Sequence, residues 1–166
     1  IKCYGGEVHG KVDLEKAFAE SCNAAFCSIG DGLNRNSWRK LCESFYCNKS
    51  IPLEKMEQKS SRFTIDNKTA QGDVRQASIG QGQTLVTPLQ NILLVCASVN
   101  GGELMQPYVV DRIEDANGNT VSENTPKSLG KKMSEKEAKQ VKKLMRGTVK
   151  GGTATSLYYG TPYKAG

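Results

Sequence analysis

The segment 87–102 constrains the fold of this 166-residue chain more than any other part of the sequence. Thr87 can cap a helix, Pro88 suits the first helical position, and Gln90 stands where the second member of a capping box belongs. The residues that follow are apolar on nearly every side of such a helix, and Asn-Gly-Gly then ends it. Because an all-apolar helix must be covered by other elements, the segment predicts a central helix from Pro88 to Val99.

Two stretches before this segment also favour helices. Residues 12–33 follow a mostly helical pattern with Asp13 as its cap, and the polar-rich Ser21-Cys22-Asn23 interrupts the apolar face. This interruption predicts a junction between two helices. A further helix should begin at Asn36 or Ser37. Four of its residues are expected on one side, namely Trp38, Leu41, Cys42 and Phe45.

The second half of the chain carries one hairpin signal and one more helix. Asn117-Gly118 lies between the strand-like stretches 108–113 and 120–121, which is typical of a β-hairpin. Ser134 and Glu137 form a second capping box. The helix that follows should have an apolar stripe made of Ala138, Val141, Met145 and Val149.

The order of these elements indicates the fold class. Residues 48–73 are polar and weakly periodic, which predicts a surface excursion. No alternation of strands and helices suggests a parallel sheet. We therefore expect a mainly α fold of the α+β type, with several helices and a small hairpin.

The positive charge of the chain is concentrated in one segment. Its net charge is +6, whereas residues 127–150 alone hold nine basic and two acidic side chains, a net charge of +7. A solvated helix face explains such a run, and an anionic partner is the alternative. Because aromatic side chains for base stacking are absent from the segment, we expect no nucleic-acid partner.

Cysteine spacing does not indicate a metal site. The chain has six cysteines and one histidine, and no C-x2-C pair. We therefore expect neither zinc nor an iron–sulfur cluster, and no cofactor. Cys22/Cys27 and Cys42/Cys47 repeat a five-residue step, which does not keep two thiols on one helix face. Buried free thiols and one or two disulfides both remain open.

Ser21-Cys22-Asn23 matches the pattern S-x-N, which carries little information by itself. With 13 serines and 10 asparagines, about 0.8 matches are expected by chance, and the chain has three. The other two, at Ser98 and Ser122, fall at a helix end and at a hairpin exit, where serine and asparagine are common. A structural reading of Ser21 is that it caps the second helix of the junction.

The surroundings of this match give it meaning. Residues 9–26, which contain S-C-N, resemble the second-motif region of penicillin-binding transpeptidases. Residues 78–90 resemble the G-Q-G segment and following helix of that family, and 100–110 and 145–154 fit its later segments in the same order. The resemblance covers nearly the whole chain. It implies the helical lobe of the β-lactamase/transpeptidase-like fold, with most of the central sheet absent.

The resemblance also implies a chemistry. The family transfers acyl groups between peptidoglycan stem peptides through a serine nucleophile, and β-lactams acylate the same serine. Ser21 is then expected to relay a proton to the leaving amine, and Asn23 to bind the substrate peptide and steady the lysine of the first motif. Gln81 is either near the substrate groove or only part of a tight turn into the helix that starts at Pro88.

Two of the three family motifs do not fit this sequence. The family's S-x-x-K precedes S-x-N, whereas the matches at Ser37 and Ser128 both follow Ser21. Lys164-Ala165-Gly166 has the wrong middle residue for K-T-G, although Ala165-Gly166 fits the slot just before that motif. We therefore expect residues 1–166 to be a partial transpeptidase domain between the two motifs, and inactive in isolation.

Expectations about partners and location follow from the family. The parent protein should bind stem peptides and β-lactams outside the cytoplasm, at the cell wall. Membrane attachment is expected only through an N-terminal anchor that these residues do not contain, since no apolar run reaches the length of a span. Apolar surface left uncovered by the absent sheet favours a homodimer. The alternative function is a non-catalytic helical module that uses residues 127–150 to bind an anionic partner.

Overall fold

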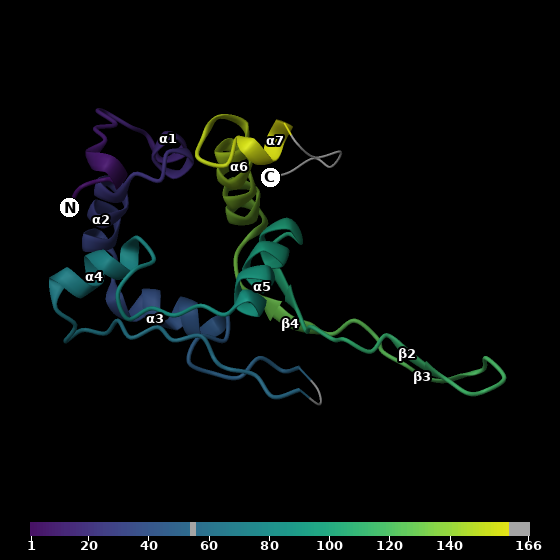
Figure 1. Cartoon of the computed structure of the whole chain (residues 1–166). Coiled ribbons are helices and arrows are strands. Elements are labelled where there is room, and N and C mark those ends of the chain that lie inside the picture. Colours follow the sequence, from purple (N-terminus) through teal and green to yellow (C-terminus); the bar gives the residue numbers. More distant parts are fainter. Residues whose placement is uncertain (54–55, 160–166) are drawn as a thin grey trace.

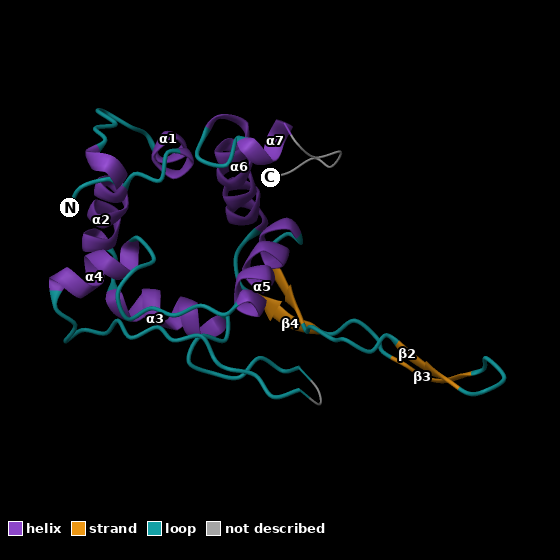
Figure 2. Cartoon of the chain, in the orientation of Figure 1, coloured by secondary structure: helices purple, strands orange, loops and turns teal. Residues whose placement is uncertain are grey.

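The structure is a computed structural model that describes residues 1–53 and 56–159. Helices dominate it, and four short strands form two separate two-stranded sheets, which confirms the expected fold class (Figures 1 and 2). The main helices are α1 (Leu14–Ala19), α2 (Asn23–Gly32), α3 (Arg35–Ser44), α4 (Gln71–Ser78), α5 (Pro88–Val99), α6 (Glu135–Gly151) and α7 (Ser156–Tyr159). A 3-10 turn, η1, spans Tyr4–Gly6.

The predicted junction between two helices is confirmed. Asp13 caps α1 by accepting a hydrogen bond from the backbone N–H of Lys16, at 2.8 Å. The helix ends at Ala19, and α2 begins at Asn23. The three residues Glu20, Ser21 and Cys22 therefore form a short connection, and the S-x-N match straddles the start of α2.

Helix α3 begins earlier than the sequence predicted. Its cap is Asn34, whose side-chain oxygen accepts a 2.9 Å hydrogen bond from the N–H of Ser37, so neither Asn36 nor Ser37 starts it. Trp38 and Cys42 pack toward the interior, but Leu41 is half exposed. The expected four-residue apolar face was therefore wrong at Leu41.

Residues 48–73 are not merely a surface excursion. Phe63 and Ile65, two residues apart on an extended segment, are buried and form a core cluster with Val74 of α4. The ring of Phe63 lies 5.0 Å from that of Trp38 on α3. The sequence prediction missed this cluster because two apolar residues in a polar stretch give almost no periodic signal.

Helix α5 has the predicted bounds, but its burial is one-sided. Thr87 caps it at 3.2 Å, whereas the Gln90 side chain does not complete the capping box and instead donates to the buried carbonyl of Phe45. Leu93 and Ala97 are buried in the main core cluster with Phe45, Ile51 and Leu104. Ile92 and Val99, on the other side, are 59% and 53% exposed, so the prediction of a helix covered all round was wrong.

The hairpin at Asn117-Gly118 is confirmed, but its first strand is shorter than predicted and begins later, and its second strand is two residues longer. β2 (Arg112–Glu114) pairs antiparallel with β3 (Thr120–Glu123) and extends away from the helices (Figure 1). A second sheet was not predicted. It pairs β1 (Glu103–Met105) with β4 (Ser128–Lys131) beside α5.

Helix α6 packs against helices from both the first and the second half of the chain. It starts with the predicted capping box of Ser134 and Glu137 and packs against both α1 and α5. Ala138, Leu144 and Val149 are its buried residues. Along the described part of the chain, no helix combines the length and apolar character that crossing a bilayer requires.

Candidate functional site

The S-x-N residues lie on the turn between α1 and α2. Ser21 has a positive φ of 53°, a backbone conformation that a serine adopts at some cost. The next residue closes the turn, because the N–H of Cys22 donates to the carbonyl of Ala17 at 2.9 Å. Ser21 is consequently exposed at the tip of the turn while its neighbour Cys22 is buried.

Asn23 is fixed by a contact to the start of the chain. It is the first residue of α2 and half-buried. Its Nδ2 donates a 3.0 Å hydrogen bond to the backbone carbonyl of Lys2. Within the described residues, its Oδ1 accepts no hydrogen bond, so this oxygen is available to a ligand.

Gln81 lies on a different element from the S-x-N turn. It stands between Gly80 and Gly82, whose φ angles of 70° and 73° are in the left-handed region. Its side chain is exposed, and its N–H donates to the carbonyl of Gln76 at the end of α4, at 2.9 Å. No contact within the described residues joins it to Ser21 or Asn23. The structure thus brings the two S-x-N residues together and leaves Gln81 apart from them.

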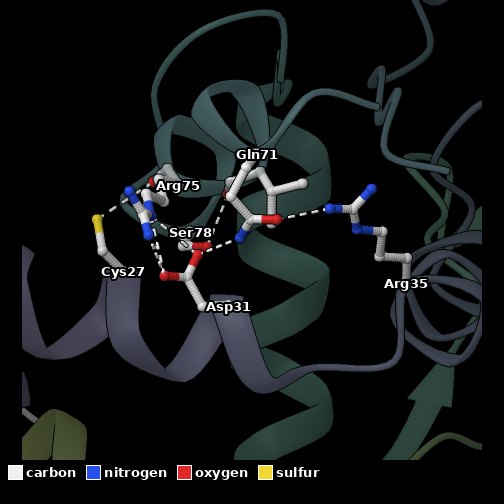
Figure 3. Close-up of polar contacts among 7 residues, drawn as sticks. Cys27, Asp31, Arg35, Gln71, Arg75 and Ser78 are labelled. Atoms are coloured by element: carbon white, nitrogen blue, oxygen red, sulfur yellow. Dashed lines mark hydrogen bonds and ion pairs between the residues drawn. The ribbon is translucent and has the colours of Figure 1, made fainter. Parts of the chain in front are cut away.

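A polar network holds α4 against the C-terminal half of α2 (Figure 3). The Asp31 carboxylate pairs with the guanidinium of Arg75, with the closest approach at 2.8 Å. Gln71 donates to the same carboxylate and accepts a 2.7 Å hydrogen bond from Arg35 of α3. The hydrogen bond from Arg75 holds the pKa of Asp31 below its usual range, and Gln71 adds to this effect.

Close packing accompanies this network. Gly30 of α2 lies against Ser78 of α4, where a Cβ built on Gly30 would stand 1.8 Å from the Ser78 hydroxyl. Cys27 contributes a weak hydrogen bond from its Sγ to the carbonyl of Arg75, at 3.5 Å. These contacts hold the C-terminal end of α2, opposite the turn that carries Ser21, against α4.

Three side chains next to the S-x-N turn are spaced to hold a metal ion. They are Cys3, His9 and Cys22, and their potential ligand atoms lie within 4.8 Å of one another. The sulfurs of Cys3 and Cys22 are 3.9 Å apart. The sequence does not reveal this group, because its members are separated by five and twelve residues, whereas zinc motifs are recognised by short cysteine spacings. The signal that could have found it is the sole histidine, which lies between two of the cysteines.

The thiol of Cys3 has an unusual environment. Backbone N–H groups at the start of α2, first of all that of Ala24, lower its pKa, and burial opposes them. A helix N-terminus stabilises an anion in this way, because its N–H groups lack partners inside the helix. The pKa of the Cys3 thiol is therefore lower than that of an unperturbed cysteine.

All six cysteines are free thiols, so the structure holds no disulfide among the described residues. Cys42 and Cys47 interact although they are five residues apart, because α3 ends at Ser44 and the chain then turns back. The hydrogen bond between them raises the pKa of Cys42 and lowers that of Cys47. The sequence predicted that a continuous helix would separate such a pair, and the helix end removes that obstacle.

The basic segment contributes to the fold as well as to the surface. Lys143 of α6 forms an ion pair with Glu15 of α1, and Lys131 lies 3.7 Å from Glu135. Part of the positive charge is thus used in contacts within the chain. The third-motif residues Lys164, Ala165 and Gly166 lie outside the described residues.

Comparisons with known proteins agree with this architecture. The family described as "Penicillin binding protein transpeptidase domain" matches residues 2–165. The peptidoglycan D,D-transpeptidase PbpA of Mycolicibacterium smegmatis is 31% identical over 151 residues, which is 87% of this chain and 30% of that protein. The chain therefore spans less than a third of the length of this relative.

Solved structures show the same fold. Penicillin-binding protein A from M. tuberculosis, as an imipenem acyl-enzyme complex, matches with a TM-score of 0.81 and 26% identity over 89% of this chain and 34% of that one. The D,D-transpeptidase domain of a peptidoglycan glycosyltransferase from Eggerthella lenta gives 0.82 and 25%, over 92% and 40%. The resemblance seen in the sequence is confirmed, and the chain belongs to the penicillin-binding protein transpeptidase family.

Proposed function

We propose that the protein containing this chain is a peptidoglycan D,D-transpeptidase, and that residues 1–166 form the part of its domain between the S-x-x-K and K-T-G motifs. The family match over residues 2–165 supports the activity. The observation that carries the assignment of this region is the turn between α1 and α2, which holds Ser21 exposed beside a fixed Asn23.

The proposed reaction is acyl transfer in two steps. A serine hydroxyl from the S-x-x-K motif attacks the carbonyl of a stem peptide, its proton passes to the lysine, and an amine leaves. The amine of a second stem peptide then attacks the acyl-enzyme and releases the serine. β-Lactams enter the first step as substitutes for the peptide. The imipenem acyl-enzyme of the M. tuberculosis protein supports this part of the proposal.

Ser21 suits the role of proton relay. Its hydroxyl both donates and accepts, so it can take a proton from the lysine and pass one to the leaving amine. The strained turn keeps the residue at the surface of the described structure, and no hydrogen bond within the described residues engages its hydroxyl. The structural alternative, a cap for α2, loses support because Cys22 occupies the capping position and Ser21 makes no capping contact.

Asn23 suits the role of orienting group. One N–H of its amide is used by the carbonyl of Lys2, which fixes the plane of the amide. The oxygen and the second N–H are left to bind a substrate peptide and the lysine of the first motif. Gln81 is a weaker candidate for substrate contact, because it has no contact with Ser21 or Asn23 among the described residues. A substrate bound at the S-x-N turn would also have to extend to the 80–82 turn to reach it.

The location of the parent protein follows from its substrate. Peptidoglycan is cross-linked outside the cytoplasm, so we place the catalytic domain at the cell wall, attached through an N-terminal membrane anchor. The partners are stem peptides and β-lactams, with no cofactor. A homodimer of the chain is a separate proposal, for which the exposed apolar side chains of α5 are the support, and sedimentation at high concentration tests it.

Labelling with a fluorescent penicillin tests the proposal. The full-length protein should be labelled stoichiometrically, because the nucleophilic serine is present there. The isolated 166-residue chain, shown by circular dichroism to be folded, should not be labelled, since neither S-x-x-K match precedes Ser21. Absence of labelling in the folded full-length protein, or stoichiometric labelling of the isolated chain, would overturn the assignment.

A further inference from the structure

The side-chain cluster at the S-x-N turn has the composition of a zinc site. Cys3 comes from the segment before η1, His9 from the segment that follows η1, and Cys22 from the turn between α1 and α2. Two thiolates and one imidazole are ligands that zinc prefers, whereas Mg²⁺ and Ca²⁺ prefer oxygen ligands. Among the described residues, this is the one group of three such side chains close enough to share an ion.

The spacing of the sulfurs agrees with tetrahedral zinc. Zinc–sulfur bonds of about 2.3 Å at a tetrahedral angle place two sulfurs about 3.8 Å apart. The Sγ atoms of Cys3 and Cys22 are 3.9 Å apart. A disulfide would bring the same atoms to about 2.05 Å. The two sulfur atoms are thus about as far apart as two ligands of one tetrahedral zinc ion.

His9 supplies an independent observation. Its side chain is only 10% exposed, and its Nδ1 is buried without any hydrogen-bond partner among the described residues. A buried polar nitrogen without a partner costs free energy unless something binds it. The other ring nitrogen, Nε2, lies 3.5 Å from a carboxylate oxygen of Glu7 and 3.9 Å from one of Glu20. Carboxylates in this position commonly orient a histidine that binds a metal through its other nitrogen.

We propose that Cys3, His9 and Cys22 bind one zinc ion, with Nδ1 as the ligand atom of His9, and that this ion fixes the S-x-N turn. Binding releases the protons of the two thiols and changes no oxidation state. Three protein ligands leave the fourth tetrahedral position to water or to a further ligand. The proposal departs from the expectation of a metal-free chain and does not depend on the proposed transpeptidase activity.

The position of the site explains what the ion would do. Cys22 lies between Ser21 and Asn23 in the sequence, and Cys3 follows Lys2, whose carbonyl holds the Asn23 amide. An ion bound by both Cys3 and Cys22 would therefore hold Lys2 and Asn23, the two residues joined by that hydrogen bond, next to each other. We expect removal of the ion to loosen the turn and lower the melting temperature.

Metal analysis tests the proposal directly. The purified protein should hold about one zinc ion per chain by inductively coupled plasma mass spectrometry. Cys3→Ser, His9→Gln and Cys22→Ser should each reduce zinc affinity by roughly tenfold or more. Cys96→Ser is the matched control, because Cys96 is an exposed thiol outside the cluster, and it should retain the ion. Chelator should lower the melting temperature of the wild type and of Cys96→Ser, and it should lower that of His9→Gln by less.

Cobalt(II) provides a second readout, which reports on thiolate coordination directly and is compared among folded proteins. Added to chelator-treated wild type, it should produce a thiolate-to-cobalt charge-transfer band that saturates at one ion per chain. In folded Cys3→Ser, which keeps only the Cys22 thiolate, the band should be weaker and should need a higher cobalt concentration to appear. A folded wild type with neither zinc nor this band, or a Cys3–Cys22 disulfide found by mass spectrometry without reduction, would overturn the proposal. So would zinc retained in all three ligand variants. None of these measurements involves penicillin, so their outcome is separable from the proposed function.

Discussion

The side-chain amide of Asn23 donates a 3.0 Å hydrogen bond to the backbone carbonyl of Lys2, which joins the first residues of the chain to the start of α2. An aspartate at this position has the same shape but cannot donate that bond. For Asn23→Asp, the loss of about 1 kcal/mol is offset by the favourable effect of a negative charge at a helix N-terminus. We therefore expect the free energy of unfolding to change by less than about 1 kcal/mol.

Acylation should respond differently to the same change. If Asn23 orients the lysine and the substrate, penicillin acylation of the full-length Asn23→Asp protein should slow by about tenfold or more, a barrier increase of at least about 1.4 kcal/mol. Urea unfolding and labelling rates measured on the same preparation separate the two effects. An acylation rate equal to that of wild type in a protein of unchanged stability would remove Asn23 from the proposed machinery.

Gly30 and Gly32 form a matched pair on α2. A Cβ on Gly30 would stand 1.8 Å from the Oγ and 2.7 Å from the Cβ of Ser78, whereas a Cβ on Gly32 would meet nothing within 4 Å. Gly30→Ala should therefore destabilise the protein by about 1–3 kcal/mol, and Gly32→Ala should be neutral or slightly stabilising. Urea unfolding checks both. Adding Ser78→Gly to Gly30→Ala should restore part of the loss, and equal effects of the two single changes would contradict the close packing of α2 on α4.

A second pair tests the contact between α6 and α1. A Cβ on Gly152 would lie 2.2 Å from the carbonyl oxygen of Ala19, and backbone atoms cannot rotate away as a side chain can. On the adjacent Gly151 a Cβ would meet nothing within 4 Å. We expect Gly152→Ala to cost about 1–3 kcal/mol and Gly151→Ala to change little. Thermal unfolding of the two variants distinguishes them, and a neutral Gly152→Ala would show that the end of α6 does not pack on α1 as described.

The ion pair between Asp31 and Arg75 predicts a pH dependence. Because Arg75 and Gln71 lower the pKa of Asp31 in the folded protein, its carboxylate stabilises the fold above the unfolded-state pKa of about 3.9. This contribution is lost as the pH falls through the lower, folded-state pKa. The melting temperature of the wild type should therefore exceed that of Asp31→Asn at pH 7. The difference should shrink below about pH 4, and a difference that grows on acidification would contradict the role of the pair.

Local signals in the sequence predicted much of the helical framework. Asp13, Thr87 and Ser134 mark helix starts by their own hydrogen-bonding capacity, so these starts could be read without knowledge of the fold. The junction at residues 20–22 was visible because polar residues interrupt an apolar face.

The parts of the fold that the sequence did not predict depend on contacts between residues that are distant in the chain. Phe63 and Ile65 are core residues only because Trp38 and Val74 meet them from other elements. Gln90 was expected to cap its own helix, but the buried carbonyl of Phe45 takes its side chain instead. The cluster around Cys22 likewise depends on how the first nine residues fold back onto α2, and no local spacing encodes that path.

In the proposed enzyme, Ser21-Cys22-Asn23 is the S-x-N motif of a D,D-transpeptidase. The most direct test is the acylation rate of the full-length protein by penicillin, compared among wild type, Ser21→Ala and Ser122→Ala. Ser122 belongs to another S-x-N match, on the exposed strand β3. We predict that Ser21→Ala slows acylation by about 100-fold or more, as loss of a proton relay does, while Ser122→Ala matches wild type. A folded Ser21→Ala protein that is acylated as fast as wild type would contradict the assignment of Ser21 as the proton relay.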